Sequence, residues 1–309
     1  MAGHTGEQHQ RERQESAPRL MRSFLFLPAH NTKFIDKALE SEADAIILDM
    51  EDAVPPARRE EARGIVRQYS ESGKLERKTV YIRINHLGTE DFVRDFSELI
   101  LPGVDGLMPS KIETAEDLVF IDRLLEFFEI KNGLPAGSVR LAPLIETTAA
   151  IANICEIAKA SPRLTALCLG GEDYLNDLGT IYVYQQTALA WPRAVLANAA
   201  RMNGLLPIDT PYLNIPDVSG FEENEKLAYK NGFAGCLLIN PRQIAPANRA
   251  FSPDEEQIDH AGRVIGAIQK AAGEGTSGVA MLNGTMVGPP MRKRAENVMV
   301  QAGLTAKRK

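Results

Sequence analysis

Eight short apolar runs recur between residues 23 and 240, and each run ends in a cluster of polar residues. The runs are SFLFL, AIILD, VYIRI, GLM, LAPLI, ALCLGG, LLPID and GCLLI. Amphipathic stretches of helical period separate them, and continuous apolar runs are typical of parallel strands buried on both faces. Eight alternating strand and helix units predict an α/β fold, a closed (β/α)8 TIM barrel. The alternative is a doubly wound open sheet, but its GxGxxG fingerprint is absent after the first run.

The chain outside these eight units divides into two further segments. Residues 1–20 are polar and are expected to form a disordered arm, and the barrel is expected to cover residues 21–272. Residues 273–309 follow a glycine-rich joint and contain a β-like turn, the pair Pro289-Pro290 and a basic helix. We expect this C-terminal segment to be a lid over a barrel mouth, its own or that of a neighbouring subunit.

The composition excludes several classes of protein. Lys plus Arg minus Asp plus Glu is 35 − 41 = −6, which gives no electrostatic footprint for nucleic acid but leaves an anionic substrate open. No apolar run approaches the roughly 18 residues of a membrane span, and the polar residues 1–19 lack the apolar centre of a secretory signal, so neither feature is expected. Cys155, Cys168 and Cys236 are too scattered for a disulfide framework or a zinc site, and the last two lie in apolar runs, which predicts buried thiols. A cytoplasmic location is the simplest expectation.

Charged residues gather where the predicted strands end, which is the end of a barrel that carries the active site. They are Glu51, Asp52, Arg83, Lys111, Glu146 and Asp173. Four carboxylates and two cations at one rim are unusual for a structural layer, because buried charges need partners or a metal.

Glu146 and Asp173 are 27 residues apart, about one strand–helix unit, so they should end neighbouring strands roughly 5 Å apart. Two carboxylates at that distance repel unless a cation or a proton lies between them. Mg²⁺ is commonly held by one or two carboxylates, with water or substrate at its other positions. The alternative is structural: Glu146 caps the following helix and Asp173 starts a turn.

The other rim residues each have a functional and a structural interpretation. Glu51 and Asp52 either hold metal-bound waters and pin Arg83, or favour the dipole of the helix that follows Pro55-Pro56. Arg83 lies in an apolar strand and needs an anionic partner, which is a substrate or, compatibly, Glu51 or Asp52. Asp49 is expected to face the sheet or a loop and is not included in the site.

Lys111 either meets a phosphate or is a solvated charge before a helix, and the solvated interpretation is favoured. His30 and His86 follow strands without a metal-ligand partner at the usual spacing, so a zinc site is not expected. The sequence contains no GxSxG elbow, no Walker loop and no plausible Ser/His/Asp order.

Four motifs, LDMEDAV, RIN, LIET and GGED, occur in this order within longer matching stretches. Together they resemble the citrate lyase beta-subunit-like family of the HpcH/HpaI aldolase superfamily, which includes malyl-CoA and citramalyl-CoA lyases. The resemblance covers about residues 20–270.

The resemblance implies a TIM barrel, Mg²⁺ (with Mn²⁺ as an alternative ion) on Glu146 and Asp173, and Arg83 facing the substrate. It also implies catalytic roles for Glu51 and Asp52 around the metal and its waters. Backbone amides near Gly171 and Glu172 would receive the carboxylate of a keto acid. Family members form trimers or hexamers in which the C-terminal segment covers a neighbour's active site.

Three positions depart from the family pattern. The stretch after the fourth strand reads Pro109-Ser110-Lys111, where only the lysine matches, and Asn240 takes the place of a histidine. Gly288 stands where many relatives have an aspartate that is offered to the adjacent subunit. The usual proton-transfer carboxylate is therefore unassigned.

We expect a Mg²⁺-dependent carbon–carbon lyase that cleaves a 3-hydroxy-acyl-CoA thioester, of the citramalyl-, malyl- or citryl-CoA type, into a 2-keto acid and an acyl-CoA. Coenzyme A would enter as part of the substrate. The alternatives are a thioesterase and an aldolase that acts on an unesterified hydroxy-keto acid. A non-catalytic ligand-binding subunit ranks last, because the set of Glu146, Asp173 and Arg83 is intact.

Overall fold

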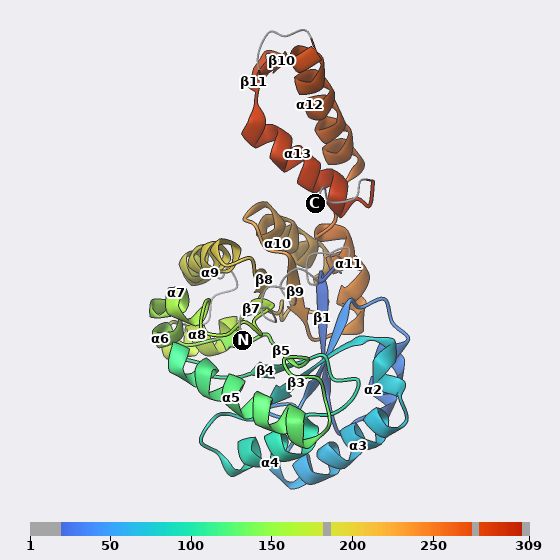
Figure 1. Ribbon diagram of the computed structural model, residues 1–309, viewed down its shortest axis with the longest axis vertical. Coiled ribbons are helices and arrows are strands. Elements are labelled where there is room, and N and C mark those ends of the chain that lie inside the picture. Colours follow the sequence, from blue (N-terminus) through green and yellow to red (C-terminus); the bar gives the residue numbers. More distant parts are fainter. Residues whose placement is uncertain (1–19, 182–186, 274–277, 305–309) are drawn as a thin grey trace, which may run out of the picture. The chain divides into compact units, whose positions relative to one another are not determined.

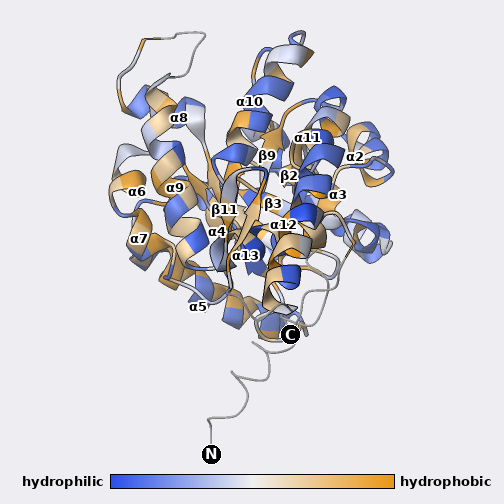
Figure 2. Ribbon diagram, turned by 90° about the horizontal axis from the view of Figure 1, so that it is seen from above, coloured by the Kyte–Doolittle hydropathy of each residue, from blue (hydrophilic) through white to orange (hydrophobic). Residues whose placement is uncertain are grey.

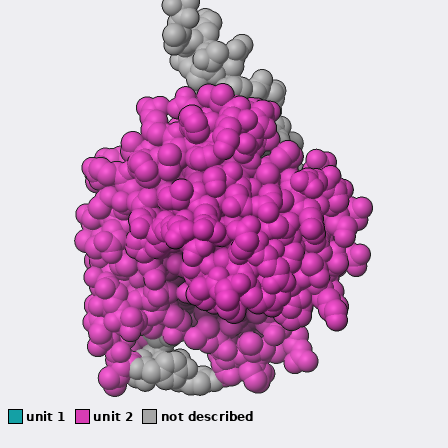
Figure 3. All heavy atoms as spheres, turned by 90° about the horizontal axis from the view of Figure 1, so that it is seen from below, with its two compact units in different colours: residues 1–20, 252–309 teal, residues 21–251 magenta. Residues whose placement is uncertain are grey.

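The computed structural model describes residues 20–181, 187–273 and 278–304, which fall into two compact units. One unit is Met21–Phe251, and its atoms form one body in Figure 3. The other contains, among the described residues, Leu20 and the chain from Ser252 onward. The first nineteen residues of the predicted N-terminal arm lie outside the described residues.

The first unit is built from nine parallel strands with helices around them (Figure 1). The strands are β1 (Ser23–Pro28), β2 (Ala45–Asp49), β3 (Thr79–Ile84), β4 (Gly106–Pro109), β5 (Arg140–Leu141), β6 (Leu144–Ile145), β7 (Ala166–Leu169), β8 (Leu206–Asp209) and β9 (Gly235–Leu238). They pair in the order β5-β4-β3-β2-β1-β9-β8-β7-β6.

The two ends of this order, β5 and β6, are one segment of chain interrupted only by Ala142 and Pro143. The Ala142 N–H donates to the carbonyl of Leu107 in β4, and the Cys168 N–H in β7 donates to the carbonyl of Pro143. The segment therefore joins both ends of the sheet, and the eight-unit TIM barrel predicted from the sequence is confirmed. Proline has no N–H to offer a neighbouring strand, which accounts for the division of the LAPLI run into two short strands.

Helices follow the strands and shield the outer face of the barrel. They are α2 (Thr32–Leu39), α3 (Arg59–Glu71), α4 (Glu90–Leu99), α5 (Ala115–Lys131), α6 (Thr148–Ala152), α7 (Ile154–Ile157), α8 (Gly171–Asp177), α9 (Ala190–Met202), α10 (Val218–Lys230) and α11 (Ile244–Ala250), with 3-10 turns η1 (Pro56–Arg58), η2 (Lys74–Arg77), η3 (Thr187–Leu189) and η4 (Pro241–Gln243). In Figure 2 the strands are mainly apolar, whereas the helices alternate between polar and apolar residues.

Side chains at the helix starts satisfy the first backbone amides. Asn31, Thr89, Thr147 and Asp217 each accept a hydrogen bond from a backbone N–H in the first turn of the helix that follows. Thr114 and Asp117 form a reciprocal capping box at the start of α5. These caps fix where each helix leaves the strand end before it, and so fix the loops at the rim.

The side chains of the strands alternate between two buried layers, as the twofold period of a strand requires. One layer lies between the sheet and the helices and includes Ile46, Leu48 and Ile82. The other fills the barrel and includes Ile47 and Tyr81, with further members Phe24, Ala45, Met108, Leu144, Cys168, Ile208 and Leu237. Cys168 and Cys236 are fully buried, as predicted, and burial raises the pKa of both thiols.

The second unit contains α12 (Glu255–Gly273), the hairpin of β10 (Ala280–Leu282) and β11 (Thr285–Val287), and α13 (Pro289–Gln301). Ala261, Val264 and Ile268 of α12 pack with Val287 and Ala295 in a small core. The two units meet between Phe251 and Ser252, whereas the sequence analysis drew the boundary at residue 272. The difference is α12, whose apolar stripe packs within the C-terminal unit.

None of the helices in the described residues combines the length and apolar character that a membrane-spanning helix needs.

Candidate active site

The carboxyl ends of the barrel strands bring together side chains that continue the inner layer. Asp49 lies two residues beyond Ile47, and Arg83 two beyond Tyr81. Four further positions follow the same rule, two residues beyond inner-layer members of β4, β6, β7 and β8: Ser110, Glu146, Gly170 and Thr210. The inner layer is apolar within the barrel and becomes polar at its mouth.

Arg83 is held by Asp49, its register partner on β2. The Arg83 Nε and Nη2 groups donate to Asp49 Oδ1 at 2.7 Å and Oδ2 at 2.5 Å. The guanidinium also lies over the ring of Phe26, 5.0 Å from its centroid. The sequence analysis was wrong to leave Asp49 out of the site, because its carboxylate fixes the orientation of Arg83 and also accepts the Glu51 and Ala53 N–H groups.

The remaining guanidinium nitrogen of Arg83 faces the two acidic residues that follow β2. Arg83 Nη1 lies 3.4 Å from Glu51 Oε2 and 3.2 Å from Asp52 Oδ2. Burial acts to lower the pKa of Arg83, but the hydrogen bonds and charge of Asp49, with the charges of Glu51 and Asp52, raise it above its ordinary value. Arg83 is therefore a permanent cation at the mouth of the barrel.

Glu51 and Asp52 differ in exposure. Glu51 is buried and accepts a hydrogen bond from Ser110 Oγ at 2.9 Å, whereas the Asp52 side chain is 69% exposed. Burial raises the pKa of Glu51, Asp52 adds to the rise, and Arg83 opposes it. The burial of Glu51 thus favours its protonated form.

Glu146 follows β6 and is 2% exposed. Its Oε1 accepts a hydrogen bond from the Lys111 backbone N–H at 2.6 Å. Burial raises the pKa of Glu146 to about 7, and the charges of Asp173 and Glu51 add to the rise, while the Lys111 N–H and Arg83 lower it. Glu146 is a buried carboxyl beside two other acids, which is the environment that a bound cation would relieve.

Lys111 contributes its backbone to the site. Its φ of 52° is in the left-handed region, which is uncommon for a residue other than glycine and is often found at functional sites. This turn directs the N–H at Glu146, while the side chain is exposed, in line with the solvated charge that the sequence favoured.

Asp173, Glu172 and Gly171 lie in the first turn of α8, directly after β7. Asp173 is exposed, and burial followed by the charge of Asp173 raises the pKa of Glu172. The Gly171 N–H donates to Thr210 Oγ1 at 2.9 Å. The Gly171 amide, expected to receive a substrate carboxylate, is thus engaged inside the protein, whereas Glu172 lies where the helix dipole favours an anion.

These residues fit a hard divalent cation with few protein ligands. Among residues 20–181, 187–273 and 278–304, no three His, Cys, Asp or Glu side chains form a cluster that could hold a metal. Two carboxylates completed by water or substrate are the usual Mg²⁺ arrangement, and the buried Glu146 feels the negative charges of Asp173 and Glu51. His30 and His86 also follow strands, β1 and β3, but neither belongs to a group of three ligands among the described residues.

Asn85, at the end of the RIN motif, ties the loop after β2 to the barrel. Its Nδ2 donates to the carbonyl of Met50 at 3.0 Å and to Asp95 Oδ2 at 2.8 Å. Asp95 is fully buried and is paired with Arg63 at 2.8 Å. This network holds the backbone that carries Glu51.

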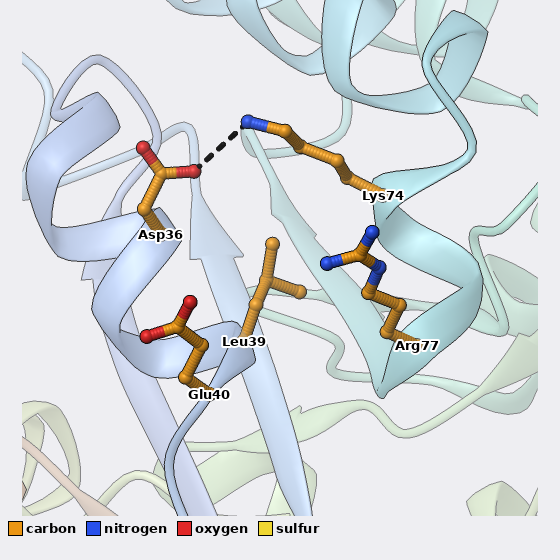
Figure 4. Close-up of a pocket in the computed structure, with 5 residues that line it drawn as sticks. All are labelled: Asp36, Leu39, Glu40, Lys74 and Arg77. Carbon is orange, nitrogen blue, oxygen red and sulfur yellow. Dashed lines mark hydrogen bonds and ion pairs between the residues drawn. The ribbon is translucent and has the colours of Figure 1, made fainter.

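A cavity of about 370 Å³ lies away from this rim (Figure 4). It is lined by Asp36, Leu39, Glu40, Lys74 and Arg77 of α2 and η2, the elements that lead into the amino ends of β2 and β3. Its charged groups largely offset each other, since Lys74 pairs with Asp36 at 3.2 Å. The cavity contains none of the residues predicted for the site.

Two of the departures from the family pattern have simple local environments. Asn240 accepts a hydrogen bond from the Arg242 N–H and caps η4. Gly288 precedes α13 with extended backbone, φ −147°, so its conformation does not require glycine. A side chain added at Gly288 would lie against Val279, 3.1 Å from its Cγ1.

Comparison with known proteins supports the architecture. The HpcH/HpaI aldolase/citrate lyase family matches residues 22–241. Citrate lyase subunit beta of Leuconostoc mesenteroides subsp. cremoris is 35% identical over 91% of this chain and 93% of its own length. L-malyl-CoA/beta-methylmalyl-CoA lyase of Rhodobacter capsulatus is 32% identical over 94% and 97%. The structure of CitE from Mycobacterium tuberculosis in complex with magnesium, acetoacetate and coenzyme A aligns with a TM-score of 0.75 and 29% identity, covering 91% of this chain and 98% of that one.

The resemblance inferred from the four motifs is thereby confirmed: a polar rim on a parallel barrel, and relatives matched over almost their whole length, show that the chain belongs to the HpcH/HpaI aldolase/citrate lyase family and is an enzyme of the lyase class.

Proposed function

We propose that this enzyme is a Mg²⁺-dependent carbon–carbon lyase that cleaves a 3-hydroxy-acyl-CoA thioester into a 2-keto acid and an acyl-CoA. The observation that supports it best is that a fixed cation lies among buried acids. Arg83 lies beside Glu51, and the charge of Glu51 raises the pKa of Glu146 whereas the charge of Arg83 lowers it. The relatives named for citrate lyase and malyl-CoA lyase, and the CitE complex with magnesium and coenzyme A, point to the same chemistry.

Glu146 and Asp173 are the proposed metal ligands. Bound there, Mg²⁺ (or Mn²⁺) would supply Lewis-acid polarisation of the hydroxyl and carboxylate oxygens of the substrate. Glu146 is held ready by the Lys111 N–H, so that one of its oxygens is fixed and the other remains to bind. Asp173, an exposed residue in the first turn of α8, is proposed to supply the second carboxylate.

Arg83 is proposed to bind the substrate and to stabilise the negative charge that develops on the thioester as the carbon–carbon bond breaks. Electrostatic stabilisation of this kind depends on a donor that is already in place, and the two hydrogen bonds to Asp49 supply that preorganisation. Glu51 is proposed to hold or transfer a proton, with Asp52 at the exposed side of the same guanidinium. The backbone amide of Glu172 is proposed to receive the carboxylate of the keto acid.

The direct experiment is an assay of purified enzyme with citramalyl-CoA, malyl-CoA and citryl-CoA, in the presence of chelator or of added Mg²⁺. We expect one of these thioesters to yield a keto acid and an acyl-CoA, with activity lost on chelation and restored by Mg²⁺. Cleavage that chelation leaves unchanged would refute the metal role. Free coenzyme A without a keto acid would indicate thioester hydrolysis in place of carbon–carbon bond cleavage.

A homotrimer or hexamer, a lid role for residues 273–309 and a cytoplasmic location are proposed with this function. Light scattering or native mass spectrometry would determine the oligomeric state.

A further inference from the structure

Gly170 and Gly171 follow β7 and are packed between Glu146, which follows β6, and Thr210, which follows β8. A Cβ added to Gly170 would lie 2.5 Å from Glu146 Cβ, and one added to Gly171 would lie 2.6 Å from Thr210 Oγ1. Both distances are too short for any side chain. The backbone that leads into α8 therefore touches Glu146 on one side and Thr210 on the other.

A chain of buried hydrogen bonds continues from this turn into the protein. The Gly171 N–H donates to Thr210 Oγ1 at 2.9 Å, and the Thr210 N–H donates to Asp209 Oδ1 at 2.9 Å. Arg193 Nε donates to the same Asp209 oxygen at 2.9 Å. Thr210 is 2% exposed and Asp209 is fully buried, so water does not compete for these bonds.

Asp209 is itself held in a closed polar environment between β8 and the helices. Burial and then the charge of Asp209 raise the pKa of Glu225, a fully buried residue of α10, to about 8. Burial also raises the pKa of Asp209, while the charge and hydrogen bond of Arg193 oppose that rise. The Arg193–Asp209 pair gives Thr210 a fixed support.

The side chain of Asp173, in contrast, is not fixed by contacts of its own. Within the part of the chain that the structure describes, its side chain has no hydrogen-bond or ion-pair partner, and it is exposed. Its position relative to Glu146 is set by the backbone of the first turn of α8. That turn is anchored at its first residue by Thr210.

We propose that Thr210 is a positioning residue that sets Asp173 against Glu146 by holding the Gly171 amide. The importance of this position for metal binding rests on the proposed function. The hydrogen bond by which Thr210 holds the Gly171 amide does not depend on it. Threonine suits the task because its β-branched side chain is stiff and its hydroxyl accepts the hydrogen bond from a position that faces into the barrel.

The test compares Thr210→Val, which removes the acceptor at nearly constant volume, with Thr210→Ser, which keeps it. Thr165→Val is the matched control, because the Thr165 hydroxyl is also hydrogen-bonded, 3.1 Å from Tyr81 Oη, but is half-buried and lies before β7 at the opposite end of the strand. Hydrogen exchange measured by mass spectrometry over residues 168–178 reports the anchor, and calorimetric titration with Mg²⁺ alone reports the carboxylate pair.

We expect Thr210→Val to exchange roughly tenfold faster across this segment and to bind Mg²⁺ about 10–100-fold more weakly. Thr210→Ser and Thr165→Val should stay close to the wild type in both measurements. Unchanged exchange in Thr210→Val, or unchanged Mg²⁺ affinity in a wild type that binds the ion, would overturn the proposal.

Hydrogen exchange requires no metal, so it decides the anchoring role even if the wild type fails to bind Mg²⁺ and the proposed function is wrong. If Thr210→Val does not fold, as judged by circular dichroism, Thr210→Ala takes its place in the same comparison with Thr210→Ser.

Discussion

Arg83 and Asp49 form a two-point pair across adjacent strands, with Nε and Nη2 on the two oxygens of one carboxylate. The pair is buried, since the side chains of Arg83 and Asp49 are 12% and 2% exposed. It leaves one guanidinium nitrogen for the rim. Asp49 therefore fixes the orientation of the otherwise flexible Arg83 side chain.

Asp49→Asn should destabilise the protein, because it removes the buried carboxylate that accepts two hydrogen bonds from the Arg83 guanidinium. We expect the free energy of unfolding to fall by about 3 kcal/mol in chemical denaturation. Asp52→Asn is the matched control for stability, since the exposed Asp52 carboxylate should contribute less than about 1 kcal/mol. Equal unfolding midpoints for the two variants would contradict this account of Asp49.

Arg83→Lys should lower kcat/KM roughly 100-fold or more, because the ammonium lacks the planar fork that contacts Asp49 and the rim together. The variant should remain folded, which near-ultraviolet circular dichroism would verify. Steady-state kinetics with the thioester that the wild type cleaves would measure the loss. Near-normal turnover would remove Arg83 from the mechanism.

Glu146 should make the metal-free protein less stable as the pH rises. Its folded pKa of about 7 lies above the ordinary carboxyl value of 4.5, so its stabilising contribution is complete below pH 4.5 and is lost as the pH rises to about 7. In chelator at pH 8, Glu146→Gln should therefore be more stable than the wild type, by up to about 3 kcal/mol. Thermal unfolding at pH 5 and pH 8 measures the difference, and a variant less stable than the wild type at both values would contradict it.

Mg²⁺ should reverse that order. Because a ligand that binds the folded state raises its stability, added Mg²⁺ should raise the Tm of the wild type at pH 8 and leave Glu146→Gln almost unchanged. Differential scanning calorimetry over a Mg²⁺ series provides the measurement. An equal rise in both proteins would locate the ion elsewhere.

Gly288→Asp should be tolerated, because extended backbone accepts any residue and the new Cβ meets only Val279. If the family's proton-transfer carboxylate acts from this position, lyase activity should rise tenfold or more, within the range of general acid–base catalysis. Gly288→Asn has nearly the same shape without the charge and is the control. Equal activity of the two variants would show that another group transfers the proton.

Much of the barrel could be predicted from the order of apolar runs, since each of the eight runs contributes a strand. The division of LAPLI at Pro143 is a local backbone effect, and the packing of α12 with α13 depends on contacts across a loop. Neither is visible in the hydrophobic period. The motif positions indicated the rim carboxylates and Arg83, because they directly follow strands.

The sequence analysis did not include Asp49 and Thr210 in the site, although the alternation of side chains along a strand indicates both. Ala45, Ile47 and Asp49 occupy alternate positions of one strand, so their side chains lie on the same face, and Asp49 lies at the mouth of the barrel. Thr210 follows Ile208 by two residues and lies at the mouth for the same reason. The use of the Lys111 and Gly171 amides could not be predicted. It depends on a left-handed turn and on the distance between strand ends, which only the folded chain sets.

The interruption at Pro143 also governs how the site responds to distortion. The first half of that segment is bonded to β4 and, through Leu141, to the residues before β7, and the second half is bonded to β7. Glu146 follows the second half, and Asp173 follows β7, its bonded neighbour. A change in the pairing of β6 with β7 would therefore alter the spacing of the two acids directly, whereas Arg83 is carried by β3 and held by Asp49 of β2.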